Sequence, residues 1–195
     1  MGFFSRKSKK QDAAGKGNTP VSRPAEAPAP QPKTITVRLL GREGAGQSTL
    51  LQALAKHAGQ QGAVRSLEDG YVLAWKGAEV CIRETHFSQL QEEPVPQAGL
   101  WYLVVGLDEG PVDLEEELVA AGRLPLRGVF MSKCDCADDD ALVDLCRIET
   151  CSCLDNKGIR SDALIFIAGS AHAAAEGYGP GGISALEELL DDIIG

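Results

Sequence analysis

The sequence predicts an α/β fold of three layers, in which helices cover both faces of a mostly parallel sheet and a disordered tail precedes the domain. Strand-like and helix-like segments alternate from residue 34 onward, which is typical of parallel sheets. Two later segments, Leu100–Gly106 (LWYLVVG) and Ala163–Ala168 (ALIFIA), are almost continuously apolar, as strands buried on both faces are. The 195 residues suffice for one globular domain, expected at 34–195, and a tail at 1–33.

The first half of the domain is expected to contain three strands and one helix. Thr34–Leu40 is a short run with β-branched residues, which favours a strand. Ser48–Ala58 carries leucine and alanine at helical spacing along one stripe. Tyr71–Trp75 and Ala78–Arg83 are expected to be strands, and the Lys76-Gly77 pair between them suits a two-residue hairpin turn.

The second half of the domain continues the alternation. Continuous apolar runs indicate its strands, and apolar residues three or four positions apart indicate its helices. The helix near residue 140 also has acidic residues in its first turns, where they interact favourably with the helix dipole. The expected strands are Leu100–Gly106, Gly128–Met131 and Ala163–Ala168, and the expected helices are Leu114–Ala121, Asp139–Cys153 and Ile183–Ile194.

The charge is distributed unevenly along the chain. The net charge is −9, but residues 1–33 hold seven Lys/Arg against two acidic residues, which is +5. Residues 34–195 hold 12 Lys/Arg against 26 acidic residues, which is −14. A body this acidic is a poor general binder of nucleic acid, so affinity for polyanions is expected only in the tail or at one local site.

The tail has the composition of a disordered tether. Residues 11–33 are rich in Ala, Pro, Gly and Gln and cannot bury enough apolar surface to offset the entropy of ordering. A solubilising tail is the favoured interpretation, and contact with an anionic membrane surface is the alternative. The aromatic and basic residues that would make this contact are Phe3, Phe4, Arg6, Lys7, Lys9 and Lys10. No secretory segment and no apolar run of roughly 18 residues occurs, so a cytoplasmic location is expected, with the membrane surface as a peripheral option.

Five of the six cysteines lie within 20 residues of one another. Without an export signal, reduced thiols are expected. Cys146 and Cys153 are seven residues apart on one predicted helix, which indicates core packing, whereas Cys136 and Cys151 are expected to be more exposed. The alternative, a metal or redox site, has less support because C-x-C pairs are less specific than C-x-x-C pairs.

A glycine-rich segment, GREGAGQST, connects the first strand to the first helix. Its spacing Gly41-x4-Gly46-x-Ser48 is that of a Walker A motif, whose glycines allow successive backbone amides to surround an anion. Ser48 is the expected ligand of Mg²⁺. Gln47 stands where the motif has lysine, so binding is expected to be weaker and catalysis impaired. The alternative is a glycine-rich turn that binds nothing.

Two further segments follow buried strands and complete a family resemblance. Ser132-Lys133-Cys134-Asp135 follows Gly128–Met131, and Gly169-Ser170-Ala171 follows Ala163–Ala168. Together with LVVGLDEGP, they resemble the GTP-binding domain of translational GTPases, specifically of the elongation factor Tu type. The resemblance covers most of residues 34–195 and implies a P-loop GTPase-like fold.

The resemblance implies a site for GTP or GDP with Mg²⁺. Asp135 would accept hydrogen bonds from guanine N1 and N2, Lys133 would cover one face of the base, and the backbone of Ser170 and Ala171 would contact guanine O6. The residues expected to hold the nucleotide are Gly41, Gly44, Ala45, Gly46, Gln47, Ser48, Thr49, Ser132, Lys133, Asp135, Ser170 and Ala171.

The departures from the family pattern concern the parts that sense and cleave the γ-phosphate. Ser132 replaces an asparagine whose amide braces the glycine-rich loop. The segment RETHFSQ (83–89) lacks Asp-x-x-Gly, although it contains His86, and residues 59–70 contain no threonine, with Ser66 as a weak substitute. The chain also ends where the family's β-barrel domains would begin, so delivery of tRNA is not expected.

The sequence therefore predicts a guanine-nucleotide-binding protein with weak or absent GTP hydrolysis. The main alternative is a nucleotide-free pseudo-GTPase that acts as a tethered interaction module for an unidentified protein partner. A third possibility is an active GTPase to which a partner supplies the missing charge. Arg42, within the glycine-rich loop, is a speculative substitute for the missing lysine.

Overall fold

The structure is a computed structural model of the whole chain, and it describes residues 33–91, 98–121, 124–137, 139–177 and 181–195. The chain divides into two units, Met1–Gln31 and Pro32–Gly195, and the description below concerns the second. The predicted tail, with its aromatic and basic residues, lies outside the described residues except for Lys33.

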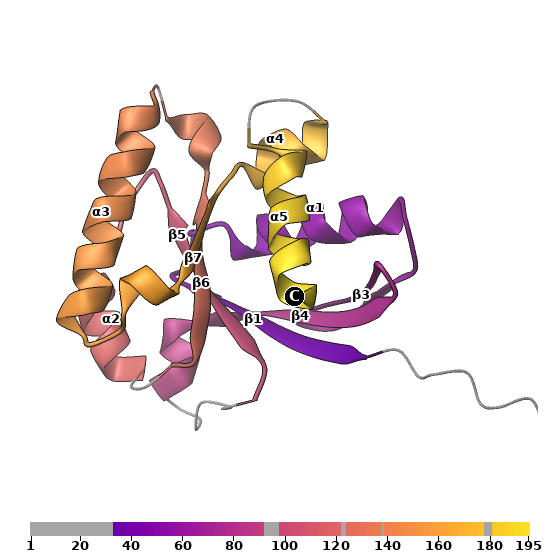
Figure 1. Cartoon of the computed structure of the whole chain (residues 1–195), viewed down its shortest axis with the longest axis horizontal. Coiled ribbons are helices and arrows are strands. Elements are labelled where there is room, and N and C mark those ends of the chain that lie inside the picture. Colours follow the sequence, from indigo (N-terminus) through magenta and orange to yellow (C-terminus); the bar gives the residue numbers. More distant parts are fainter. Residues whose placement is uncertain (1–32, 92–97, 122–123, 138, 178–180) are drawn as a thin grey trace, which may run out of the picture. The chain divides into compact units, whose positions relative to one another are not determined.

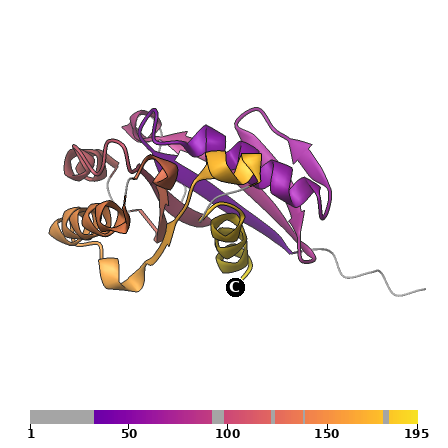
Figure 2. The ribbon, with the colours of Figure 1, turned by 90° about the horizontal axis from the view of Figure 1, so that it is seen from above.

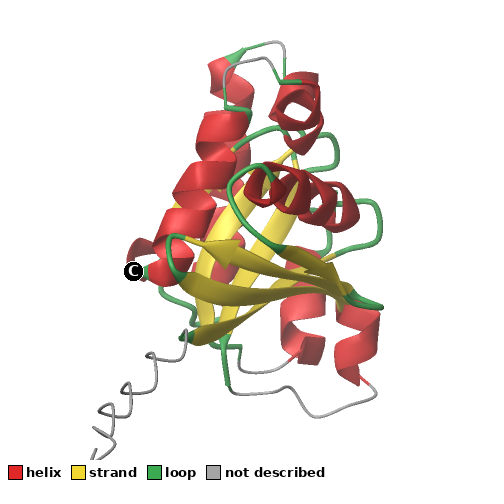
Figure 3. Cartoon of the chain, turned by 90° about the vertical axis from the view of Figure 1, so that its right-hand side faces the viewer, coloured by secondary structure: helices red, strands yellow, loops and turns green. Residues whose placement is uncertain are grey.

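A seven-stranded sheet forms the centre of the second unit, with the strand order β2-β3-β4-β1-β5-β6-β7 (Figure 3). Five of these strands, β4, β1, β5, β6 and β7, run parallel to one another, whereas β2 and β3 extend one edge with antiparallel pairing. The strands are β1 (Thr34–Gly41), β2 (Val64–Ser66), β3 (Gly70–Trp75), β4 (Ala78–His86), β5 (Leu100–Gly106), β6 (Leu126–Ser132) and β7 (Ile165–Ala168).

Helices lie on both faces of the sheet, which confirms the three-layer α/β prediction. The helices α2 and α3 lie on one side, at the left of Figure 1, and α1, α4 and α5 lie on the other. They are α1 (Gln47–Gly59), α2 (Leu114–Ala121), α3 (Asp140–Asn156), α4 (Ala171–Glu176) and α5 (Ile183–Ile194), with 3₁₀ turns η1 (Phe87–Gln91), η2 (Cys134–Cys136) and η3 (Ser161–Ala163). No helix among the described residues combines the length and apolar character needed to cross a bilayer.

The strand β5, which lies between β1 and β6, contributes to two hydrophobic cores. Tyr102 and Val104 pack in the core beneath α1 and α5, whereas Trp101, Leu103 and Val105 pack in the core beneath α2 and α3. Because successive side chains of a strand point to opposite faces, a strand that packs against a core on each face carries apolar residues on both faces. The prediction that Leu100–Gly106 is buried on both faces is therefore confirmed.

The β3–β4 hairpin also follows the sequence prediction. Lys76 and Gly77 both have positive φ, 44° and 85°, as a type I′ turn requires, and Trp75 pairs with Ala78. The strand β4 continues to His86, three residues beyond the predicted end, because its polar residues pair in parallel with β1. The edge strand β2 and the helix α4 were not predicted, since three and six residues are too short to show a periodic pattern.

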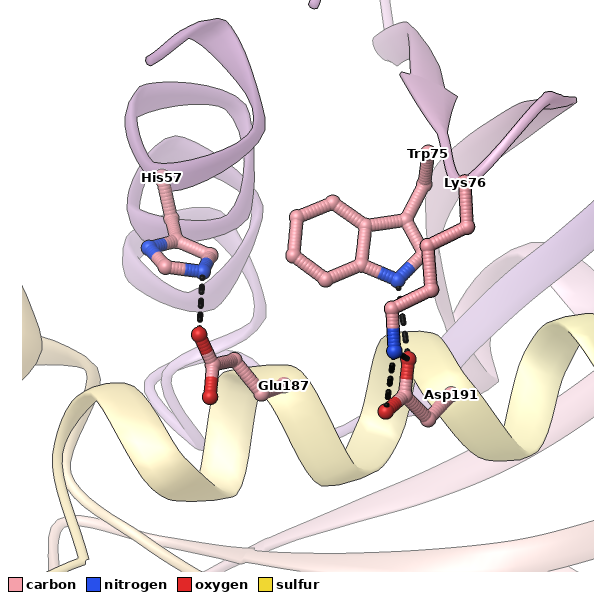
Figure 4. Close-up of polar contacts among 5 residues, drawn as sticks. All are labelled: His57, Trp75, Lys76, Glu187 and Asp191. Atoms are coloured by element: carbon pink, nitrogen blue, oxygen red, sulfur yellow. Dashed lines mark hydrogen bonds and ion pairs between the residues drawn. The ribbon is translucent and has the colours of Figure 1, made fainter. Parts of the chain in front are cut away.

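The C-terminal helix α5 packs on α1 and β3 through apolar and polar contacts. Figure 2 shows α4 alongside α1, and the Nζ of Lys56 on α1 donates to the Ala175 carbonyl at 2.5 Å. Figure 4 shows that Glu187 and Asp191 of α5 point toward α1 and toward the end of β3, respectively. Glu187 lies 3.3 Å from Nε2 of His57, and Asp191 accepts hydrogen bonds from Trp75 Nε1 at 3.0 Å and from Lys76 Nζ at 2.6 Å.

A second carboxylate of α5 ties the helix to the centre of the sheet. Asp192, nearly buried, accepts a hydrogen bond from the buried Tyr102 hydroxyl and two from the Arg127 guanidinium, at 3.1 and 2.6 Å. Burial and the hydrogen bond to Asp192 raise the pKa of Tyr102 well above its ordinary value. The α5 helix is thus anchored by a network that satisfies a polar group in the core.

The Asp192→Ala variant is expected to lower the free energy of unfolding by about 1–3 kcal/mol, because it removes the partner of a buried hydroxyl. Urea unfolding measures the effect. Asp162→Ala, which breaks the exposed pair with Arg160, serves as the control and should unfold like the wild type. Equal midpoints for Asp192→Ala and the wild type would contradict the role assigned to this network.

Candidate functional site

The candidate site lies at the carboxyl edge of the five parallel strands. The loop after β1 leads to α1 on one face of the sheet, whereas the loop after the neighbouring β5 leads to α2 on the other face. Ligands of open α/β sheets bind where the connections of adjacent strands diverge in this way. The three segments singled out in the sequence follow β1, β6 and β7, so they all lie at this edge.

The glycine loop, Gly41–Gly46, connects β1 to α1. Gly44 and Gly46 have positive φ values of 87° and 98°, which glycine adopts without strain. A Cβ on Gly46 would lie 3.2 Å from the Ser132 hydroxyl, so the loop also packs closely on the end of β6. Two glycines are therefore needed for the loop conformation, and the loop leads directly into the N-terminus of the 13-residue helix α1.

Gln47 provides a buried donor beside this loop. The residue is only 2% exposed, and among the described residues its Nε2 has no hydrogen-bond partner. Nε2 lies against the first residue of the loop, because a Cβ on Gly41 would be 2.6 Å from it. An unpaired buried amide destabilises a fold by about 1–3 kcal/mol, and an acceptor bound in the loop would remove that penalty.

Glu84 is a site residue that the sequence reasoning missed. Its carboxylate accepts a hydrogen bond of 2.6 Å from the Ser48 hydroxyl at the start of α1. The register of β4 against β1 pairs Glu84 with Leu39 and thereby brings the carboxylate to the loop. Glu84 does not match the family pattern Asp-x-x-Gly, because the acid is glutamate and Phe87 stands where the pattern has glycine. A hydroxyl beside a carboxylate is a donor set that suits Mg²⁺.

Ser132 braces the glycine loop, contrary to the expectation that replacing asparagine removes this support. The side chain is only 1% exposed, and its hydroxyl donates to the Ala45 carbonyl within the loop. The same oxygen lies 3.3 Å from the Val105 carbonyl at the end of β5. A hydroxyl at the end of β6 can therefore reach the loop because Gly46, without a side chain, allows the close approach.

Lys133 and Asp135 follow Ser132 in the sequence. Lys133 adopts a left-handed conformation with φ 59°, and its Nζ pairs with Asp108 at 2.6 Å. A Cβ on Gly46 would lie 4.0 Å from Lys133 Cε, so the lysine stem runs beside the glycine loop. Asp135 lies in η2 and is exposed, and among the described residues its carboxylate has no hydrogen-bond or ion-pair partner.

The Gly169-Ser170-Ala171 segment is joined to the segment that holds Asp135. The Cys134 N–H donates to the Gly169 carbonyl at 3.3 Å, and the Ser170 side chain caps α4 by accepting from the Ala173 N–H at 2.9 Å. The Ser170 N–H donates to the Gly181 carbonyl at 3.2 Å, so this donor already has a partner within the protein. The Ala171 N–H occupies the first position of α4, where no intrahelical carbonyl is available.

Arg42 does not serve as a substitute lysine. Its three guanidinium nitrogens contact Glu117 at 3.1 Å, Asp113 at 3.8 Å and the Val112 carbonyl at 2.9 Å, all at or before α2. Burial raises the pKa of Glu117 above its ordinary value, although Arg42 favours the ionised form. The arginine of the glycine loop is thus directed toward α2.

The segment after Glu84 is ordered by its own contacts. His86 pairs with Gly41 at the end of β4, and its backbone N–H donates to Gln89 Oε1 at 2.8 Å. Phe87 is buried in the core with α2 and α3. A pocket of about 490 Å³ lies here, and it is lined by Arg42, Glu43, His86, Phe87, Ser88 and Glu117.

The remaining candidates lie apart from this arrangement or on the surface. Thr49 is exposed on the first turn of α1, and Ser66 lies on the exposed edge strand β2. Cys146 is buried and Cys136 exposed, as predicted, while Cys151 and Cys153 are both half-buried. Burial raises the pKa of the Cys134 thiol to about 11. No group of three or more His, Cys, Asp or Glu within the described ranges could hold a metal ion.

Comparison with models of known protein families finds no family that matches this chain. The likeness to translational GTPases therefore depends on the quoted motifs and on the α/β fold.

The Ser132→Ala variant should destabilise the domain by about 1–3 kcal/mol, because the buried Ala45 carbonyl loses its donor. It should also speed amide hydrogen exchange in the glycine loop relative to the rest of the sheet. Mass spectrometry of exchange and urea unfolding measure the two effects. The exposed Ser152→Ala is the matched control on α3, and unchanged loop exchange in Ser132→Ala would contradict the bracing role.

Proposed function

We propose that this chain binds a guanine nucleotide, GDP or GTP with Mg²⁺, and that it hydrolyses GTP weakly or not at all. The observation that carries the proposal is the convergence of three segments at one sheet edge. The glycine loop is braced by Ser132, and the Asp135 segment is hydrogen-bonded to Gly169. Segments more than 120 residues apart in the sequence are thus connected by hydrogen bonds at this edge.

The phosphate groups would bind at the glycine loop. Backbone amides of the loop and the N-terminus of α1 attract anions, and the unpaired Nε2 of Gln47 supplies a further donor. Ser48 and Glu84 would hold Mg²⁺, directly or through its water ligands, and the bound ion would neutralise phosphate oxygens. These residues fit the group because they combine an unsatisfied donor with a hydroxyl–carboxylate pair.

The base would bind near Asp135. A free, exposed carboxylate can accept from two N–H groups of guanine, whereas adenine offers no matching pair at that edge, so the carboxylate would select guanine. The Ala171 N–H is the remaining backbone donor for guanine O6, since the Ser170 N–H is used by Gly181. Lys133 would lie beside the base while paired with Asp108.

Several features support weak or absent hydrolysis. Gln47 brings no charge to the phosphates, and Arg42 is committed to Glu117 and Asp113. A charge-assisted hydrogen bond contributes roughly 1.5–3 kcal/mol, against about 1 kcal/mol for a neutral one. Phosphoryl transfer depends almost entirely on positioning and on such charge, so its loss affects the rate more than binding.

Titration of the purified full chain with fluorescent GDP in the presence of Mg²⁺ tests the proposal. Saturable binding is expected, and Asp135→Ala should weaken it at least about tenfold by removing the base acceptor. Asp144→Ala, which removes an exposed carboxylate of α3, is the matched control and should bind as the wild type does. Absence of saturable binding, or equal affinity of Asp135→Ala, would refute nucleotide binding here; multi-turnover phosphate release would refute the claim on hydrolysis.

A second function, that of a protein-interaction module, is favoured by the outer surface of α3. Leu142, Leu145 and Ile148 are 41%, 51% and 66% exposed, and they lie within two turns of the helix. Asp144 and Glu149 are exposed on the same helix. Large apolar side chains grouped in this way mark interaction sites on soluble domains.

The charges around this α3 surface indicate the chemistry of the partner. An apolar row bordered by carboxylates suits an amphipathic helix that carries leucines flanked by lysines or arginines. A second copy of the same surface would place like charges opposite each other, which disfavours self-association. The proposed partner segment is therefore a basic amphipathic helix.

A synthetic helical peptide with leucines flanked by lysines is expected to bind the chain, and binding should weaken as salt rises. The double variant Leu145→Ser, Ile148→Ser should reduce affinity at least about tenfold. Val64→Ser, at an exposed position on β2, is the control and should not change binding. Fluorescence anisotropy provides the measurement, and equal binding of a matching peptide with glutamates in place of lysines would exclude the proposed chemistry.

A further inference from the structure

We propose that the free edge of β2 is a docking site for an extended segment of a partner protein. The segment carries an acidic residue and, two positions away, a large apolar residue. It adds a further strand to the sheet beyond β2, which is the last strand at one edge. This edge is separate from the glycine loop and from the α3 surface, so the inference goes beyond nucleotide binding and does not depend on it.

The backbone of β2 has hydrogen-bonding groups that β3 does not use. The Leu67 N–H donates to the Gly70 carbonyl at 2.9 Å, and Arg65 is the next residue of β2 in the same phase of the antiparallel ladder. Because bonded pairs alternate along such a ladder, the N–H and carbonyl groups of Val64 and Ser66 point away from β3. Among the seven strands described, β2 alone has no buried or half-buried residue. An exposed edge of this kind can pair with a strand of another chain.

The face of the sheet that carries Arg65 is not covered by a described helix at this edge. Leu73 and Trp75 of β3 pack in the core beneath α1 and α5. Val72 and Ala74 alternate with them and so lie on the opposite face, and neither belongs to the core beneath α2 and α3. Arg65 pairs with Val72 and shares this face. Figure 1 shows α2 and α3 at the left, away from β3, so side chains of an added strand can reach this part of the sheet.

A groove of about 410 Å³ lies at this edge, and small residues line much of it. Ala63, Ala74 and Gly77 are among its lining residues, together with Arg65 and Glu79. Ala63 and Ala74 are neighbours, since the Ala74 N–H donates to the Ala63 carbonyl at 2.9 Å. Because alternate residues of a strand share a face, Ala63 lies two positions from Arg65 on the same side. The groove therefore accommodates a large apolar side chain two residues from the one that faces Arg65.

Arg65 determines the charge of the partner segment. It is exposed, and among the described residues it has no ion-pair partner, because the nearby Asp69 is paired with Arg83 at 2.8 Å. Opposite charges directly across two strands stabilise their pairing, which favours an acidic residue in this position. A second copy of this chain is disfavoured. The antiparallel register that pairs all of β2 with the same strand of another copy places two Arg65 side chains opposite each other, and like charges there are destabilising.

Fluorescence anisotropy with a labelled peptide, Thr-Phe-Thr-Glu-Thr-Phe-Thr, tests the docking. The peptide places phenylalanine two positions before and after the glutamate, so it presents the required pattern in either strand direction. Saturable binding to the full chain is expected, and Arg65→Glu should weaken it at least about tenfold. A peptide with lysine in place of glutamate should bind Arg65→Glu more tightly than it binds the wild type. Arg160→Glu, which reverses another exposed arginine, is the matched control and should bind the glutamate peptide as the wild type does.

Hydrogen exchange of single amides, followed by NMR, locates the bound peptide. The amides of Val64 and Ser66 should exchange more slowly when the peptide is bound, whereas that of Arg65, already bonded to β3, should change little. Absence of saturable binding, binding without protection of these two amides, or equal affinity of the wild type and Arg65→Glu for the glutamate peptide would overturn the proposal. Protection in the free chain that grows with protein concentration would assign the edge to a second copy instead.

Discussion

The arrangement depends on one constraint, the parallel register of β1 between β4 and β5. Both β1 and β5 contribute side chains to the cores on the two faces of the sheet, so neither strand can slip by a residue without exchanging its buried faces. This register sets Gly41 beside His86 and Val104 and places Glu84 within reach of Ser48. The positions of the site residues follow from the packing of the cores.

The candidate site combines well-positioned hydrogen-bond donors with cationic side chains that already form ion pairs within the protein. Ser132 braces the glycine loop, and Cys134 links the two segments that follow β6 and β7, so the framework of the site is internally hydrogen-bonded. Arg42 and Lys133, by contrast, form ion pairs with neighbouring carboxylates. A preorganised framework without available charge supports the proposal of nucleotide binding with little hydrolysis, because phosphoryl transfer depends on charge stabilisation. The exposed apolar residues Leu142, Leu145 and Ile148 of α3 form a separate surface, and none of them takes part in these hydrogen bonds.

The sequence reasoning was most successful where one physical effect dominated. A continuous apolar run predicted β5, which is buried on both faces, and the Lys76-Gly77 pair predicted the hairpin turn. The run Ala163–Ala168 also predicted a strand, but β7 begins only at Ile165 and lies at the edge of the sheet, where Ile167 alone is fully buried, so the expected burial on both faces was wrong. The sequence reasoning also failed at Glu84 and at the bracing role of Ser132. Both depend on the distance between residues more than 35 positions apart, which no local pattern encodes. The extension of β4 to His86 was missed for the same reason, since its polar residues are stabilised by pairing with β1.

By itself, the sequence determined the layers, the order of most elements and the three segments that lie at one edge of the sheet. These follow from side-chain periodicity and from the rule that parallel strands end on the same side. Only the tertiary structure decided which side chains meet there: that Gln47 is buried and unpaired, that Arg42 turns to α2, and that a glutamate of β4 reaches Ser48. Hydrogen bonds and ion pairs form over about 3 Å, and such distances are set by the packing of the whole domain.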